Sequence, residues 1–171
     1  MVSISLVKRN VAAVAATTCS ESGLDSHIGY RDSFDDRTPV QRSIDRFIVP
    51  PGSACRVLVG DLEFYYEDGQ HITGISLYYD VRRAKSANLT MSRPRAGPVW
   101  LAFPSAADQD RDVVRYPASI DVWQDRENNT VRVVLGDAGP SDFYELAENL
   151  WLGRTAAGDI GEVWFLGVVW A

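Results

Sequence analysis

Hydrophobic and polar residues alternate with a period of two along much of this chain, a pattern that predicts β-strands rather than helices. The strongest example is a β-prone run at 56–66, followed by Asp68-Gly69 and a second run at 72–81. Asp-Gly between two such runs is typical of a hairpin, because glycine accepts the positive φ that tight turns require. We therefore expect these segments to pair as antiparallel strands.

Two further hairpins are predicted in the C-terminal half. One joins strands at 120–124 and 130–135 through a turn whose Asn128 and Asn129 tolerate left-handed backbone angles. The other joins a strand at 149–155 to one at 160–170. This last strand is apolar on both of its faces, which is typical of a central strand covered on both sides.

The remaining segments are assigned more simply. Strands are expected at 2–7 and 98–104, a short helix at 40–47, a polar connection at 105–117 and a long exposed loop at 19–38. The stretch at 141–148 fits either one or two helical turns or an extended edge strand.

These elements together favour one β-rich domain spanning residues 1–171. The chain is long enough to bury roughly 70% of the surface that its unfolded form exposes, so a core without disulfide or metal staples is possible. We predict a mainly β fold, an antiparallel β-sandwich or partly closed β-barrel of about eight strands with one or two short helices. All five tryptophans lie in the last 72 residues, so we expect the C-terminal half to supply most of the core.

Charge and composition narrow the choice of partners. The net charge is −6, which disfavours binding to a phosphate backbone as the main activity. The basic residues between Arg82 and Arg95 are either an anion-binding or partner-binding loop or a solvated one. No segment has the roughly 18 apolar residues of a membrane span, so we predict a cytoplasmic protein without a membrane partner.

The two cysteines, Cys19 and Cys55, are too few for a disulfide framework. They form either one bridge or two free thiols. The two histidines are far apart in sequence, and the three acids Asp32, Asp35 and Asp36 lack the glycine and the closing glutamate of a calcium loop. We predict no metal site and no cofactor.

Residues 119–170 resemble a family of small uncharacterised domains built from two β-hairpins. The likeness is carried by the strands 120–125, 131–135, 150–152 and 163–169 and by the turn at 156–159. Some members are encoded beside small toxins. The resemblance therefore implies an antitoxin-like or immunity-like role, and it implies no functional residues.

Familiar catalytic signatures do not occur in the sequence. It has no Gly-x-Ser-x-Gly elbow, no phosphate-binding Gly-x-x-x-x-Gly-Lys-Ser/Thr loop and no dinucleotide-binding glycine pattern.

The remaining candidate for a site is the polar side of the first hairpin, where four residues would line a pocket if the sheet curled into a barrel. They are Glu63, Tyr65, Tyr78 (or its neighbour Tyr79) and Asp80. A carboxylate desolvated beside aromatic rings has a raised pKa and acts as a general acid or base. The alternative is that these tyrosines pack across strands at the surface.

Two functions follow from these patterns. The first is a non-catalytic binding protein that inhibits a protein partner in an antitoxin-like manner, with Asp32, Asp35 and Asp36 as its acidic contact residues. The second is a β-barrel that binds a small apolar ligand, either as a carrier or as a cyclase or isomerase that uses the pocket carboxylate and tyrosines. An enclosed cavity favours the second, and a filled core favours the first.

Overall fold

The computed structural model describes residues 4–9, 12–31, 55–67, 71–91, 97–103, 113–137 and 139–171. Within them the chain forms fifteen strands and one short 3-10 helix. In the N-terminal half the strands are β1 (Ser5–Lys8), β2 (Ala12–Ser20), β3 (Gly23–Arg31), β4 (Cys55–Val59), β5 (Leu62–Glu67) and β6 (His71–Tyr78), followed by the helix η1 (Val81–Arg83) and by β7 (Lys85–Ser86). The C-terminal half contains β8 (Val99–Ala102), β9 (Val113–Tyr116), β10 (Ile120–Asp125), β11 (Thr130–Leu135), β12 (Asp142–Ala147), β13 (Leu150–Arg154), β14 (Ile160–Phe165) and β15 (Val169–Trp170).

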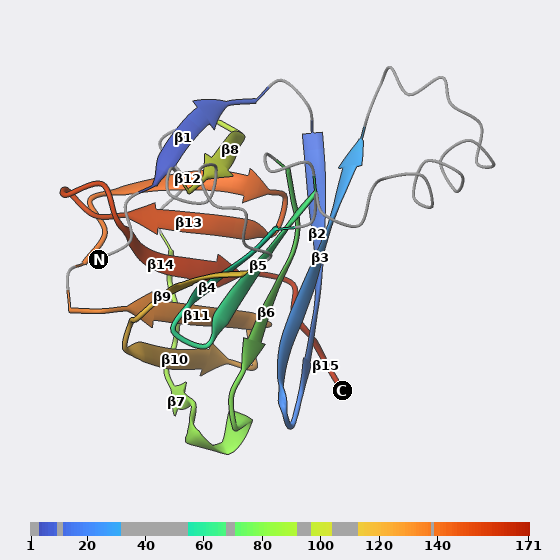
Figure 1. Ribbon diagram of the computed structural model, residues 1–171. Coiled ribbons are helices and arrows are strands. Elements are labelled where there is room, and N and C mark those ends of the chain that lie inside the picture. Colours follow the sequence, from blue (N-terminus) through green and yellow to red (C-terminus); the bar gives the residue numbers. More distant parts are fainter. Residues whose placement is uncertain are drawn as a thin grey trace.

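The strands form two large sheets and a small ribbon. One sheet has seven strands in the order β15-β2-β3-β6-β5-β4-β9, the other has six in the order β12-β13-β14-β11-β10-β7, and β1 pairs only with β8. The two large sheets lie against each other with their strands crossing steeply, and the β1–β8 ribbon lies along one side near β12 (Figure 1). This arrangement is a β-sandwich whose sheets do not close into a barrel.

The seven-stranded sheet buries one face and presents the other outward. On β5 the side chains of Leu62 and Phe64 are completely buried, and their cross-strand neighbours Leu77 and Ile75 on β6 are buried with them. The residue between the two on β5, Glu63, points to the opposite face. The period of two in the sequence therefore separates the core from an outer polar face.

In the six-stranded sheet, β14 lies between β13 and β11, and all six of its residues are buried. Val163 and Phe165 face the core beside Val133 and Val131 of β11, whereas Glu162 and Trp164 lie on the other face. The prediction of a central strand covered on both sides is confirmed.

The two large sheets are joined at one corner. Val14 of β2 forms an isolated bridge to Glu148, just beyond β12. The Ala15 amide donates to the Glu148 carbonyl at 2.9 Å, and the Glu148 amide donates to the Ala13 carbonyl at 2.8 Å.

The buried apolar side chains of both sheets and of the β1–β8 ribbon form one core cluster. Both halves of the chain supply it, so the prediction that the C-terminal half dominates the core was wrong: Trp164 is buried, but the other four tryptophans are only partly so.

The predicted loop at 19–38 was wrong over the part that the structure describes. Residues 19–31 belong to the end of β2 and to β3, which pair as a hairpin through a tight turn after Ser20. Their serines, glycines and charged residues look loop-like because only alternate positions, such as Leu24 and Ile28, point into the core. Residues 32–38, like the helix expected at 40–47, lie outside the described residues.

Three other boundaries differ from expectation. The run at 56–66 is two strands, β4 and β5, separated by a turn at Gly60, whose φ is +61°. The connection at 105–117 contains the short strand β9, which pairs in parallel with β4. The final strand breaks at Gly167 (φ +60°), so that β15 leaves the six-stranded sheet and pairs with β2 in the other one.

The other predicted hairpins are confirmed by the pairing of β5 with β6, β10 with β11, and β13 with β14. Residues 142–147 form the edge strand β12, which settles the choice left open between a helix and a strand. The turn between β10 and β11 is closed by Asp125: one carboxylate oxygen accepts from the Asn128 amide at 3.0 Å and the other from the Leu89 amide at 2.9 Å. Asn129 in this turn has the positive φ, +50°, that its residue type permits.

We expect an acid-sensitive contribution to stability from Asp125. Its hydrogen bonds from the Asn128 side chain and from the backbone amides of Leu89 and Asn128 lower its pKa below the ordinary value. Because the folded pKa is depressed, the stabilisation is present above the unfolded pKa of about 3.9 and is lost as the pH falls through the folded value. Asp125→Ala should therefore lower the melting temperature at pH 7, and its difference from the native protein should shrink towards pH 2. Glu127→Gln, in the same turn, is the control, and a difference independent of pH would contradict this assignment.

Candidate functional site

An open cleft of about 360 Å³ lies where the end of β6 faces β10. Its walls combine apolar and charged side chains. The lining residues are Asp61, Leu77, Tyr78, Tyr79, Asp80, Arg83, Ala84, Lys85, Ile120, Asp121 and Val122. The cleft therefore joins the turn after β4, the segment from the end of β6 to β7, and the first half of β10.

The floor of the cleft is continuous with the core. Leu77 is almost fully buried, and Tyr79, Ile120 and Val122 are partly buried side chains packed against the core cluster. At this edge the six-stranded sheet ends in β7, which has only two residues and pairs in parallel with Trp123 and Gln124 of β10. So short an edge strand leaves apolar side chains near the end of β6 open to solvent.

Charged residues of both signs form the rim. The Lys85 ammonium lies 2.9 Å from the Asp121 carboxylate and 5.0 Å from the centre of the Trp123 ring. Asp80 pairs with Arg82 at 3.0 Å and also accepts the Arg82 backbone amide at 3.0 Å. The side-chain and backbone hydrogen bonds from Arg82 hold the pKa of Asp80 below its ordinary value. This is the opposite of the raised pKa expected for a pocket acid, so Asp80 is a fixed negative charge.

Tyr79 connects the floor to the core of the seven-stranded sheet. Its hydroxyl lies 3.5 Å from the Cys19 sulfur. Burial raises the pKa of both Tyr79 and Cys19, so both groups are protonated near neutral pH. Cys19 is a free, buried thiol. Of the two alternatives left open by the sequence, the disulfide bridge to Cys55 is therefore wrong.

The structure divides the four residues predicted for a barrel pocket. Tyr78, with 64% of its surface exposed, and Asp80 line the cleft, as does Tyr79. Glu63 and Tyr65 do not: they lie on the outer face of the seven-stranded sheet, away from the core. The prediction that the four residues share a pocket depended on the sheet curling into a barrel. The sandwich is open, so it does not bring Glu63 and Tyr65 together with Tyr78 and Asp80.

On that outer face Glu63 and Tyr65 belong to a polar network across the strands. One oxygen of Glu63 lies 3.2 Å from the Arg56 guanidinium, and the other accepts from the Tyr65 hydroxyl at 3.0 Å. Ser76, opposite Glu63 in register, donates to Asp25 on the next strand. Burial raises the pKa of Tyr65 to about 12, so this phenol is a hydrogen-bond donor to Glu63 at physiological pH. The network fits the alternative of cross-strand packing at the surface.

The acidic residues Asp32, Asp35 and Asp36 lie outside the described residues. In the described part of the chain no group of three or more histidine, cysteine, aspartate or glutamate side chains is placed to hold a metal ion. Among those same residues, no helix is long and apolar enough to cross a membrane.

Of the residues that line the cleft, sequence reasoning predicted only Tyr78, Tyr79 and Asp80 for a pocket. Ile120, Asp121 and Val122 lie more than 40 residues after the β5–β6 hairpin, and nothing in the local pattern places them opposite Tyr79. The sequence held one signal: Ile120 and Val122 are apolar at alternate positions, so they share one face of the strand. The structure shows that both are only partly buried. No protein-family model and no curated protein matches this chain.

Proposed function

We propose that this protein is a non-catalytic binding domain and that the cleft between the end of β6 and β10 is where it contacts a protein partner. The observation that carries the proposal is the combination of an apolar floor (Leu77, Tyr79, Ile120, Val122) with an exposed aromatic residue, Tyr78, at the mouth. Such a cleft buries an apolar side chain while the rim fixes its orientation.

The composition of the rim favours a protein as the partner. Tyrosine, tryptophan and arginine are the residue types enriched at protein interfaces and at their energetic centres. Tyr78 and Arg83 line the opening, and Lys85, which also lines it, lies against the Trp123 ring. Charges of both signs beside them give the surface a means of selecting a complementary partner.

Two further points support binding over catalysis. Asp80 is ionised and paired with Arg82, so it serves as a charge and an acceptor rather than as a proton donor. The tyrosine hydroxyl at the floor has a raised pKa and is likewise suited to donate a hydrogen bond and not to remove a proton. The likeness of residues 119–170 to small hairpin domains found beside toxins agrees with an antitoxin-like or immunity-like role.

Removing the Tyr78 ring tests this proposal. An exposed aromatic residue at the centre of an interface typically contributes at least about 2 kcal/mol, so we expect Tyr78→Ala to weaken partner binding about thirtyfold. The partner is isolated by quantitative affinity capture with the native chain, purified, and titrated against both proteins by calorimetry. Tyr78 is exposed, so the fold should be retained.

Val7→Ala is the matched control, because Val7 is also an exposed apolar residue (57%) but lies on β1, at the other end of the molecule (Figure 1). Its affinity should equal that of the native chain. Equal affinity of the Tyr78→Ala variant would place the contact surface elsewhere.

A small amphipathic ligand is the second candidate, and the observation favouring it is the size of the cleft. A volume near 360 Å³ falls within the range of roughly 300–1,000 Å³ that is usual for small-molecule sites. Such a ligand would place an apolar body against Ile120 and Val122 and a polar end beside Lys85 or Asp80. A fragment screen followed by methyl NMR separates the candidates: saturable shifts confined to Ile120, Val122 and Leu77 would favour the small ligand.

A further inference from the structure

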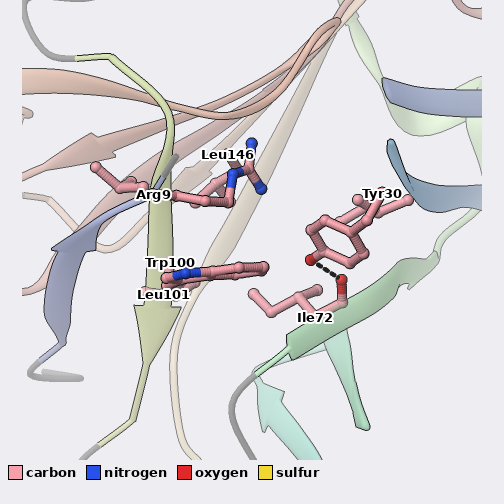
Figure 2. Close-up of a pocket in the computed structure, with 8 residues that line it drawn as sticks. Arg9, Tyr30, Ile72, Trp100, Leu101 and Leu146 are labelled. Atoms are coloured by element: carbon pink, nitrogen blue, oxygen red, sulfur yellow. Dashed lines mark hydrogen bonds between the residues drawn. The ribbon is translucent and has the colours of Figure 1, made fainter. Parts of the chain in front are cut away.

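Arg9 follows β1 directly, and its side chain is buried. Its backbone amide donates to the Pro98 carbonyl at 2.8 Å, which anchors the chain beside β8, and only 3% of the residue is exposed. The side chain extends from the β1–β8 ribbon towards the seven-stranded sheet (Figure 2). A cation in this position has been removed from water, which is costly unless something compensates it.

The guanidinium lies beside a pair of aromatic rings that contact each other. Its central carbon lies 5.1 Å from the centre of the Trp100 ring and 5.5 Å from that of Tyr30, and the two rings are 5.1 Å apart. Cation–π attraction offsets part of the desolvation cost but supplies no hydrogen-bond acceptor in the plane of the guanidinium. Tyr30 directs its own hydroxyl to the Ile72 carbonyl (Figure 2).

The guanidinium borders a small cavity with otherwise apolar and aromatic walls. Its volume is about 10 Å³, and besides Arg9 it is lined by Ile28, Tyr30, Ile72, Val99, Trp100, Leu101 and Leu146. Within the part of the chain that the structure describes, Nε and Nη2 of Arg9 are buried and have no hydrogen-bond partner. These two nitrogens are on the same edge of the guanidinium, so their N–H bonds form the fork with which arginine binds anions.

Two neighbouring groups compensate the charge of Arg9 only in part. Burial lowers the pKa of Arg9, and the electrostatic and hydrogen-bonding effects of Tyr30 and the attraction of Glu145 oppose this shift without abolishing it. Arginine nevertheless stays protonated at any physiological pH, because the guanidinium is not deprotonated in proteins. The site therefore holds a buried cation, two of whose donors have no partner, in the wall of a small cavity.

We propose that the Arg9 cavity is a binding site for one small monatomic anion, chloride under physiological conditions. A volume of about 10 Å³ is the lower limit for one sphere of water size, which excludes phosphate, sulfate and carboxylates. Chloride is somewhat larger than water, so the lining side chains must move slightly to admit it. A water molecule would satisfy the two donors but bring no negative charge to the partly compensated guanidinium, whereas a halide does both. The anion fixes the β1–β8 ribbon against β3 and β6, because Trp100, Tyr30 and Ile72 all border the same cavity.

Halide-dependent stability is the first test. The native protein is unfolded in urea at constant ionic strength, with sodium chloride replaced stepwise by sodium gluconate, whose anion is too large for the cavity. Above the dissociation constant of chloride, the folded-to-unfolded ratio should rise about tenfold for each tenfold rise in chloride concentration. Equal stability in chloride and gluconate at every concentration would overturn the proposal.

Two further measurements fix the location. Crystals grown in sodium bromide should show an anomalous peak within hydrogen-bond reach of Nε and Nη2 of Arg9. Arg9→Met should remove the chloride dependence, while Arg56→Met, which changes an arginine whose side chain is 50% exposed, should retain it. If the Arg9→Met protein does not fold, the anomalous bromide peak in crystals of the native protein is by itself the test of the site. No peak at Arg9, or chloride dependence that persists in Arg9→Met, rejects the site.

Discussion

Glu162→Ala should lower the free energy of unfolding by about 3–5 kcal/mol, because it breaks a buried ion pair at one partner. Glu162 is 2% exposed at the centre of the six-stranded sheet. One carboxylate oxygen accepts from the Arg132 guanidinium, and the other accepts from the Trp164 indole N–H at 2.7 Å. Arg132 also lies over the Trp164 ring, 5.4 Å from its centre. Alanine removes the acceptor of both donors. The Trp164 indole N–H is left unpaired in a buried position, and Arg132, whose side chain is 30% exposed, loses its carboxylate where water reaches only part of it.

Glu162→Gln is the matched control for this effect. Its amide oxygen can still accept from Trp164, while the negative charge facing Arg132 is lost, so we expect a clearly smaller loss. Urea unfolding of both variants measures the difference. A loss below about 1 kcal/mol for Glu162→Ala would show that Arg132 is well solvated and that the pair contributes no more than a surface ion pair.

Phe165→Ala should destabilise the fold by about 3–5 kcal/mol, the usual cost of removing a buried phenylalanine ring. Phe165 is completely buried in β14 and lies opposite Val131 on one side and Leu150 on the other. Because both neighbours are held in paired strands, the backbone cannot move in to fill the space. The loss would come from apolar burial and from the cavity that remains.

Phe165→Leu tests the cavity part of this argument. Leucine keeps much of the apolar volume, so we expect a loss of about 1–2 kcal/mol. The midpoint and slope of urea unfolding report the stability of each variant. Similar losses for alanine and leucine would mean that the ring shape of Phe165, and not the volume it fills, determines the packing at this position.

The class of the fold and most of its strands follow from sequence because local signals dominate there. Asp68-Gly69, the turn at Asp125–Asn129 and the two-sided apolar run of β14 each specify a hairpin or a central strand without reference to the rest of the chain. The Gly60-Asp61 turn carried the same kind of signal between the apolar runs of β4 and β5, and reading it would have separated the two strands.

The candidate site was only partly predictable for a different reason. Tyr78 and Asp80 were identified as polar residues at the end of a hairpin, which is a local property. Their true neighbours across the cleft, Ile120 and Asp121, depend on how two sheets cross, and no short-range pattern encodes that. The ion pair of Glu162 with Arg132 was hidden for the same reason, since a single acid in an apolar strand does not reveal its cross-strand partner.

The measurement that tests the central claim most directly is hydrogen exchange of this chain, free and bound to its purified partner. The proposal that the cleft is the contact surface predicts slowed exchange at residues 77–85 and 120–123, with the β1–β8 ribbon unchanged. Slowed exchange confined to other surfaces, such as the outer face that carries Glu63 and Tyr65, with 77–85 unaffected, would contradict it.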